Sequence, residues 1–221
     1  IIKIIFTRTM NILLATAEAA PFAKTGGLAD MAQSFPLEWR KAEHRPIVIL
    51  PKYRDIDVEK WGFVATDLIL YVPISNWTEF ARLWKGYFPG TDVEVYLVEN
   101  NDYFGRPGLY GYPSEFWDND RRFIFFSRAV LEAAKALNFK PDILHAHDFH
   151  SAFSMAFLKS FYKSHELFSG TKGVFTIHNL AYQGWFNPYR ALDFAQFGIS
   201  QFYTGSWFEH YGVVNAIKTG I

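Results

Sequence analysis

Residues 11–41 have the sequence NILLATAEAAPFAKTGGLADMAQSFPLEWRK, in which a short apolar run is followed by a glycine loop and a segment of helical period. The run from Asn11 to Ala15 is apolar after its first residue, as a strand covered on both faces should be. A helix is expected from about Leu28 to Lys41. A strand, a tight loop and a helix in this order begin a βαβ unit, so the segment predicts an α/β fold.

The same alternation continues along the chain. Further strands are predicted at Pro46 to Leu50, Val93 to Val98, Ile143 to Ala146 and Gly173 to Ile177. Further helices are predicted from Asn119 to Leu137 and from Ser151 to Tyr162. An antiparallel pair, Leu68 to Val72 with Phe80 to Lys85, is expected to elaborate the region after the second strand. With no internal repeat and no long linker, the pattern predicts one Rossmann-like domain, a mainly parallel sheet flanked by helices.

Composition restricts the partners of the chain. Of its 221 residues half are hydrophobic, and 22 Lys and Arg balance 22 Asp and Glu, so no net field attracts nucleic acid or an anionic membrane surface. No apolar run approaches the roughly 20 residues that span a bilayer. The absence of cysteine excludes disulfides and thiolate chemistry and fits a reducing compartment. We therefore expect a globular protein with neither nucleic acid nor membrane as partner.

The loop between the first strand and the first helix is the most informative segment for function. It contains Glu18, Lys24, Gly26 and Gly27, and a ligand at the carboxyl edge of a parallel sheet lies above such a loop. Glycines permit close approach and positive φ, a helix N-terminus attracts anions, and Lys24 adds a cation, so a diphosphate would fit. The alternative is a glycine turn that merely begins a helix, with Lys24 solvated. The loop is neither Gly-x-Gly-x-x-Gly nor a Walker loop, which argues against hydride transfer and nucleoside triphosphate hydrolysis.

Two further strands end in polar residues. The first leads into His145-Ala-His-Asp148-Phe-His150, whose strand and turn residues do not imply a compact tetrahedral metal site. Asp148 is expected either to bind ligand or to cap the following helix. The second strand leads to His178 and Asn179, which can hydrogen-bond sugar hydroxyls, although a single such histidine is more often a buried, satisfied residue.

A fourth stretch, residues 104–112, is a glycine and proline loop with the aromatic residues Phe104, Tyr110 and Tyr112. Exposed rings in such a loop would stack against a sugar chain. Packing of the loop against the domain is the alternative that the residues leave open.

The motifs Lys24-Thr-Gly-Gly-Leu-Ala-Asp, Leu50-Pro-Lys-Tyr, His145-Ala-His-Asp and Thr176-Ile-His-Asn-Leu-Ala-Tyr-Gln-Gly occur in order and at fitting spacings. As a set they resemble bacterial glycogen synthases and plant starch synthases, from about Met10 to the last residue. The resemblance implies the N-terminal Rossmann-like domain of a two-domain glycosyltransferase of the GT-B type. It also implies a retaining enzyme that uses no metal or cofactor and moves glucose from ADP-glucose, or UDP-glucose in some members, to the non-reducing end of an α-1,4-glucan.

The same resemblance assigns roles to residues of this chain. Residues near the transferring glucose or the reaction centre would be His178, Asp148 and Glu18. Residues near the donor would be Lys24, Gly26, Gly27 and Asn179. Acceptor contacts would come from Tyr110 and Phe149, where Phe149 replaces the tryptophan usual in the family. Trp39 and Glu43 replace what are commonly Leu and Gly, changes expected to affect packing and the helix stop but not the site.

The resemblance also implies what these residues lack. We expect residues 1–9 to be an extension or a fragment edge and residues 10–221 to be the N-terminal catalytic domain, without the C-terminal nucleotide-binding domain. That domain would supply an arginine, a lysine and a glutamate, so the chain alone is expected to be inactive. The implied location is the cytoplasm, or a plastid in a plant or alga. The alternatives are a non-catalytic α-glucan-binding or regulatory module, a related glycosyltransferase, or a glycoside hydrolase using Glu18 with Asp148.

Overall fold

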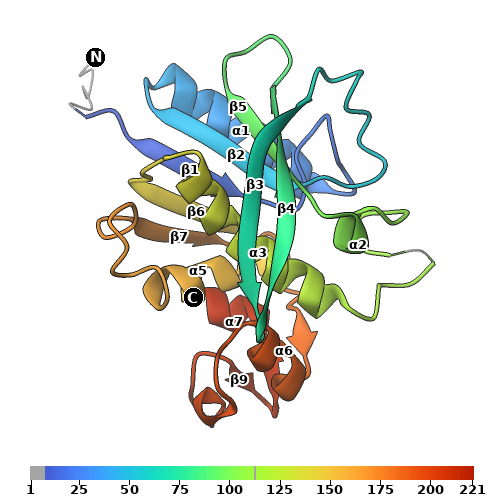
Figure 1. Cartoon of the computed structure of the whole chain (residues 1–221), viewed down its shortest axis with the longest axis vertical. Helices are drawn as coiled ribbons and strands as arrows, with labels where there is room; N and C mark the ends of the chain where they lie inside the picture. Colours follow the sequence, from blue (N-terminus) through green and yellow to red (C-terminus); the bar gives the residue numbers. More distant parts are fainter. Residues whose placement is uncertain (1–7, 112) are drawn as a thin grey trace.

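The computed structural model describes residues 8–111 and 113–221, and its centre is a sheet of seven strands in the order β3-β4-β5-β2-β1-β6-β7 (Figure 1). The strands are β1 (Asn11–Ala15), β2 (Arg45–Pro51), β3 (Val64–Ile74), β4 (Trp77–Tyr87), β5 (Glu94–Glu99), β6 (Ile143–His147) and β7 (Lys172–Thr176). All neighbours from β5 to β7 are parallel, whereas β3 and β4 are antiparallel at one edge. The predicted mainly parallel sheet is confirmed, and the five predicted parallel strands agree with the structure to within about one residue at each end.

Helices cover both faces of this sheet. The helices are α1 (Gly27–Lys41), α2 (Asn101–Phe104), α3 (Asn119–Ala136), α4 (Asp148–Ser151), α5 (Phe153–Lys159), α6 (Pro188–Phe194) and α7 (Ala216–Gly220), with a 3-10 turn η1 (Ile199–Gln201). Trp39 of α1 contacts the ring of His145 on one face of β6, with 5.6 Å between centroids. On the other face, a Cβ at Gly173 of β7 would meet Met155 of α5. Figure 1 shows α1 behind the sheet and α5 in front of it.

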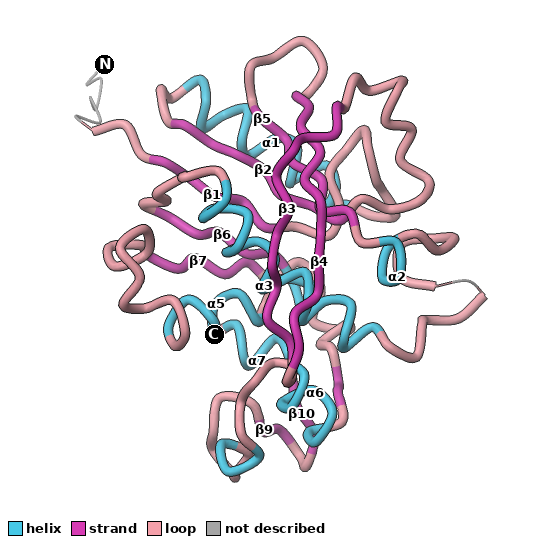
Figure 2. Tube along the Cα trace, in the orientation of Figure 1, coloured by secondary structure: helices cyan, strands magenta, loops and turns pink. Residues whose placement is uncertain are grey.

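The antiparallel pair is longer than predicted. β3 and β4 have 11 residues each and form a ribbon that crosses the molecule (Figure 2). The tip of this ribbon is fastened to the end of α6, because the Ser75 N–H donates to the carbonyl of Phe194 and the Ser75 hydroxyl donates to Asp193. The charged residue Asp67 interrupts the apolar pattern of β3, and the pairing with β4 shifts register between Ala65 and Ile69. The sequence of the first half of β3 therefore does not indicate a strand.

The C-terminal part differs most from the prediction. The helix predicted from Ser151 to Tyr162 corresponds to α5, which begins at Phe153 and ends at Lys159, and the preceding helix α4 shares only Ser151 with the prediction. A second, three-stranded sheet consists of β8 (Trp185–Phe186), β9 (Glu209–His210) and β10 (Val213–Asn215), in the order β8-β10-β9. Strands of two or three residues are too short for a recognisable period, which is why the sequence did not indicate them.

The two substitutions near the end of α1 are visible in the backbone and the packing. Glu43 follows the helix cap in a left-handed conformation, with φ of 66°, where glycine is favoured. Trp39 packs against His145, which lies two residues before the end of β6. The Trp39 ring thus lies against a histidine of β6, and the expectation that neither change reaches the site stays a prediction.

None of the helices among residues 8–111 and 113–221 combines the length and the apolar composition of a membrane span. The same residues hold no group of three or more His, Cys, Asp or Glu side chains that could bind a metal ion. Of the expected extension, residues 1–9, the first seven lie outside the described residues, as does Tyr112 of the aromatic loop.

Candidate active site at the carboxyl edge of the sheet

Three neighbouring parallel strands end at the same edge and deliver the polar residues that the sequence singled out. β1 leads to the glycine loop, β6 ends at His147 and is followed by Asp148, and β7 leads to His178. β6 lies between the other two and is paired in parallel with both. The sheet order therefore places the three polar segments side by side at the edge where ligands of such folds bind.

Glu18 holds the glycine loop. Its side chain is buried, and its carboxylate accepts hydrogen bonds from the Thr25 N–H (2.6 Å), the Thr25 hydroxyl (2.6 Å), the Gly26 N–H (3.2 Å) and the Tyr110 hydroxyl (2.6 Å). Four donors occupy most of the acceptor positions of one carboxylate. In this structure Glu18 thus shapes the loop, and direct contact of Glu18 with a substrate stays a prediction.

The loop that Glu18 holds is open above its glycines. A Cβ at Gly26 or Gly27 would meet nothing within 4 Å. Neither glycine has a positive φ, so the backbone conformation does not require glycine at these positions. What the two glycines provide is open space above the loop. The Gly26 N–H donates to Glu18, but the first N–H groups of α1 have no partner within the helix. An anion can approach these groups closely.

Lys24 lies beside this opening but is not free. Its ammonium group forms an ion pair with Asp30, at 2.7 and 2.9 Å from the two carboxylate oxygens. Both side chains are more than half exposed, at 51% and 55%. An exposed pair of this kind is worth little in water, so Lys24 can exchange Asp30 for another anion at small cost.

Asp148 connects the ends of two strands. Its Oδ1 accepts the backbone N–H of His178 at 2.7 Å, and burial raises the pKa of this carboxyl group above the usual value. The alternative that Asp148 caps a helix is wrong, because α4 begins at Asp148 itself and has no side-chain cap. Asp148 also has positive φ (55°), a conformation that is uncommon outside glycine and is concentrated at functional sites.

Histidines from β6 and β7 form a connected group. The Nε2 atom of His178 lies 2.9 Å from Nδ1 of His147, and Nε2 of His145 lies 2.7 Å from the hydroxyl of Thr176. Burial lowers the pKa of His147 to about 2 and that of His145 to about 4, so both imidazoles are neutral near pH 7. Neutral rings hydrogen-bond hydroxyl groups without bringing charge to them.

Asn179 and the loop after it lie at the rim of this group. The Asn179 side-chain oxygen accepts the Ala181 N–H at 2.8 Å, which folds the start of the loop. Leu180 and Tyr182 are 65% and 59% exposed. The structure thus places Asn179 beside His178 at the strand end, while its contact with a donor sugar remains a prediction.

The two residues expected to contact an acceptor are packed into the domain. The Tyr110 ring stacks on His150 with 4.6 Å between centroids, and its hydroxyl donates to Glu18. Phe149 is 7% exposed and packs against Phe123. Phe104, from the same loop as Tyr110, is fully buried. The loop-packing alternative therefore describes Phe104, whereas Tyr110 is only partly buried. Contact of Tyr110 and Phe149 with an acceptor stays a prediction.

Sequence reasoning missed Arg122, which positions the loop that carries Tyr110. Arg122 is fully buried and donates to the carbonyls of Tyr103 (2.7 Å) and Leu109 (2.9 Å) and to the side-chain oxygen of Asn119 (2.7 Å). Burial lowers its pKa to about 10. Arg122 follows Arg121 in a helix of mixed polarity, and nothing in the sequence signals which of the two faces inward, so only the three-dimensional packing reveals it.

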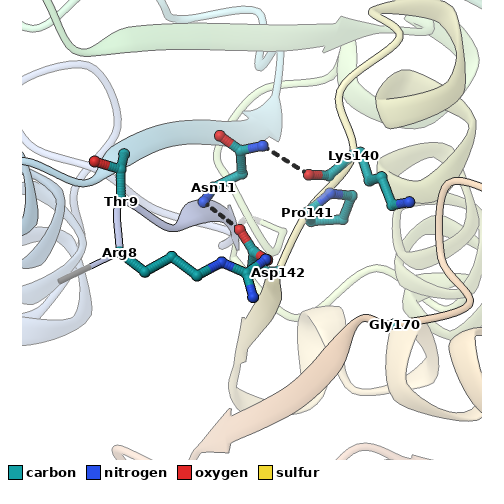
Figure 3. Close-up of a pocket in the computed structure, with 7 residues that line it drawn as sticks. All are labelled: Arg8, Thr9, Asn11, Lys140, Pro141, Asp142 and Gly170. Carbon is teal, nitrogen blue, oxygen red and sulfur yellow. Dashed lines mark hydrogen bonds and ion pairs between the residues drawn. The ribbon is translucent and has the colours of Figure 1, made fainter.

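A hollow at the opposite edge of the sheet is lined by residues at the amino ends of β1 and β6 (Figure 3). There the Asn11 side chain donates to the carbonyl of Lys140 at 2.9 Å, and the Asn11 N–H donates to Asp142 at 2.8 Å. Figure 3 shows Arg8 beside Asp142, with which it forms an ion pair. These contacts join strand starts, and none of the polar strand ends described above lines this hollow.

The fold and the site together define a class of protein: a Rossmann-like α/β domain with polar groups at three adjacent strand ends. The family model for the starch synthase catalytic domain matches residues 11–221, and the chain therefore belongs to that family. A glycogen synthase from Elusimicrobium minutum is 43% identical over 96% of the chain, and glycogen synthase 1 from Geobacter sulfurreducens is 41% identical over 81%. These alignments cover 43% and 36% of the two relatives, so the chain spans less than half of their length.

A solved structure gives the same classification. The chain is similar to the catalytic domain of starch synthase IV from Arabidopsis thaliana bound to ADP and acarbose, with a TM-score of 0.86 and 26% identity. The match covers 96% of this chain and 43% of that one. The fold is accordingly that of a GT-B glycosyltransferase domain.

Proposed function

We propose that this chain is the acceptor-side half of a retaining glucosyltransferase that transfers glucose from ADP-glucose to the non-reducing end of an α-1,4-glucan. The observation that carries the proposal is the convergence of the open glycine loop, Asp148 and His178 at one edge of the sheet. Membership in the starch synthase family supports the reaction class, as do relatives named glycogen synthase. The ADP and acarbose of the similar structure support a nucleotide sugar as donor and a glucan as acceptor.

The glycine loop is proposed to bind the donor phosphates. Departure of a nucleoside diphosphate from glucose builds negative charge on the phosphates, so groups already aimed there stabilise the transition state more than the ground state. The first N–H groups of α1 and the ammonium group of Lys24 would serve this purpose once Lys24 releases Asp30. Gly26 and Gly27 leave the space that such an approach requires.

Asp148 and His178 are proposed to contact the transferring glucose. Asp148 holds the backbone of His178, so the position of one fixes the position of the other. The hydrolase alternative needs a free carboxylate pair, but Glu18 already accepts four hydrogen bonds, which makes it a poor acid or nucleophile in this arrangement. The cytoplasmic location inferred from the sequence stays a prediction.

A second domain is part of this proposal. The chain spans less than half of the length of the two relatives, and the family resemblance implies that the remainder supplies further phosphate ligands and a glutamate. We expect the 221-residue chain to be inactive alone and the longer protein that contains it to be active. A glucan-binding module without catalysis is the competing outcome.

Transfer of labelled glucose from ADP-glucose to maltooligosaccharide tests the proposal in the longer protein. Lys24→Ala should raise the KM for ADP-glucose about tenfold, because it removes one contact to the donor phosphates. Lys41→Ala, an exposed lysine paired with Glu38 at the other end of α1, is the matched control and should leave KM unchanged. Glucan binding without any transfer would support the module instead, and equal effects of the two lysine variants would remove the donor role of the loop.

A further inference from the structure

Three histidines lie in a row at the ends of β6 and β7. His145 and His147 are two residues apart on one strand and therefore share a face, with 4.3 Å between their ring centroids. His147 in turn is hydrogen-bonded through Nδ1 to Nε2 of His178. The backbone N–H of His178 is held separately by Asp148, so both the main chain and the ring of His178 have fixed partners.

The contact between His147 and His178 requires one proton between the two nitrogens. At 2.9 Å one of them must donate and the other must accept. Burial lowers the pKa of His147 to about 2, so this ring carries a single proton at neutral pH, on either Nδ1 or Nε2. The position of that proton decides which nitrogen of His178 is protonated.

The surroundings of His147 select one of these two positions. The side chain is fully buried, and among residues 8–111 and 113–221 its Nε2 atom has no hydrogen-bond partner. A proton on Nε2 would leave an unpaired buried N–H, which native structures avoid more strictly than an unpaired acceptor. The Phe35 ring lies 6.0 Å away between centroids and could offer only a weak N–H···π contact.

We infer that His147 carries its proton on Nδ1 and donates it to Nε2 of His178, which fixes His178 as the Nδ1–H tautomer. Free histidine in water favours the opposite tautomer, so the protein reverses the intrinsic preference of His178. His147 is then a positioning residue that makes Nδ1 of His178 a hydrogen-bond donor. If the proposed function holds, this donor meets an oxygen of the transferring sugar. That contact rests on the proposed function, whereas the assignment of the tautomer is independent of it.

Long-range proton–nitrogen correlation spectra of the ¹⁵N-labelled chain read the protonated nitrogen of each imidazole directly. In the wild type we expect His147 and His178 both as Nδ1–H. His147→Leu should return His178 to Nε2–H, because the donor is gone. His147→Asn keeps an N–H donor at the Nδ1 position and should retain the Nδ1–H tautomer of His178. His145→Leu is the matched control from the same strand and should change nothing at His178.

Two results would overturn the inference: an Nε2–H tautomer at His178 in the wild type, or an unchanged tautomer in folded His147→Leu. Should His147→Leu fail to fold, the wild-type spectrum alone still decides. In the longer protein, His147→Leu should lower kcat for glucose transfer about tenfold with KM for the donor nearly unchanged, and His147→Asn should restore most of the loss. A wild type with the expected tautomer but no transfer would refute the proposed function and leave the tautomer assignment standing.

Discussion

Acidification should destabilise this domain through its buried histidines. His145, His147 and His150 are each less than 9% exposed, and burial lowers their pKa values to about 4, about 2 and about 3. An unfolded chain exposes the same rings with pKa values of about 6.5. Below that value the unfolded state binds more protons than the folded state, so stability that is fully present above pH 6.5 is lost as pH falls.

The size of the effect follows from the linkage. Each histidine contributes a slope of about 1.4 kcal/mol per pH unit once the unfolded ring is protonated, or about 2 kcal/mol between pH 7 and pH 5. Three such rings remove about 6 kcal/mol over that interval, against a total of about 5–15 kcal/mol for a typical domain. The raised pKa of Asp148 acts in the opposite direction and offsets part of this loss at the acid end.

Urea unfolding at several values between pH 7 and pH 5 measures the slope. His150→Phe keeps a ring to stack on Tyr110 but removes one titrating group, so it should reduce the loss of stability by about a third. A wild type that loses less than about 1 kcal/mol over this interval, or a variant with an unchanged slope, would show that the buried histidines do not control the acid stability.

Three further substitutions test the glycine loop, the end of α1 and Asp148. Glu18→Gln replaces one acceptor oxygen by an N–H donor that faces other donors, among them the Tyr110 hydroxyl, and it should cost about 2 kcal/mol of unfolding free energy. The control Glu38→Gln, at an exposed position, should cost nothing measurable. Glu43→Gly relieves a left-handed backbone and should stabilise by about 0.5–1 kcal/mol in the same assay; a loss would show that φ at this position is not strained. Asp148→Asn keeps an acceptor and removes a buried charge, so thermal unfolding should change little while transfer by the longer protein falls about a hundredfold; unchanged transfer would exclude Asp148 from the site.

The sequence predicted the parallel strands well because residues such as Leu13, Leu14 and Val48 are buried on both faces and leave uninterrupted apolar runs. It predicted the hairpin only in part, since one face of β3 is exposed and carries Asp67 and Tyr71. A break between α4 and α5 could not be foreseen, because no proline or glycine marks it.

For the site, the sequence indicated which strand ends carry polar groups but not what those groups contact. Tyr110 is 92 residues from Glu18, and the hydroxyl-to-carboxylate contact between them depends on the loop that Arg122 holds. The hydrogen bond between His147 and His178 joins neighbouring strands and depends on their register. Side-chain contacts of this kind follow from tertiary structure, which local patterns do not contain.

Chemical shift changes in the labelled chain during titration with maltoheptaose and ADP-glucose show at which edge of the sheet the ligands bind. We expect the amide signals of Gly26, Gly27, His178 and Asn179 to shift, while those of Asn11 and Gly170, beside the hollow at the opposite edge, do not. Shifts confined to the opposite edge, or no shifts at the carboxyl edge with either ligand, would contradict a ligand site at the carboxyl edge.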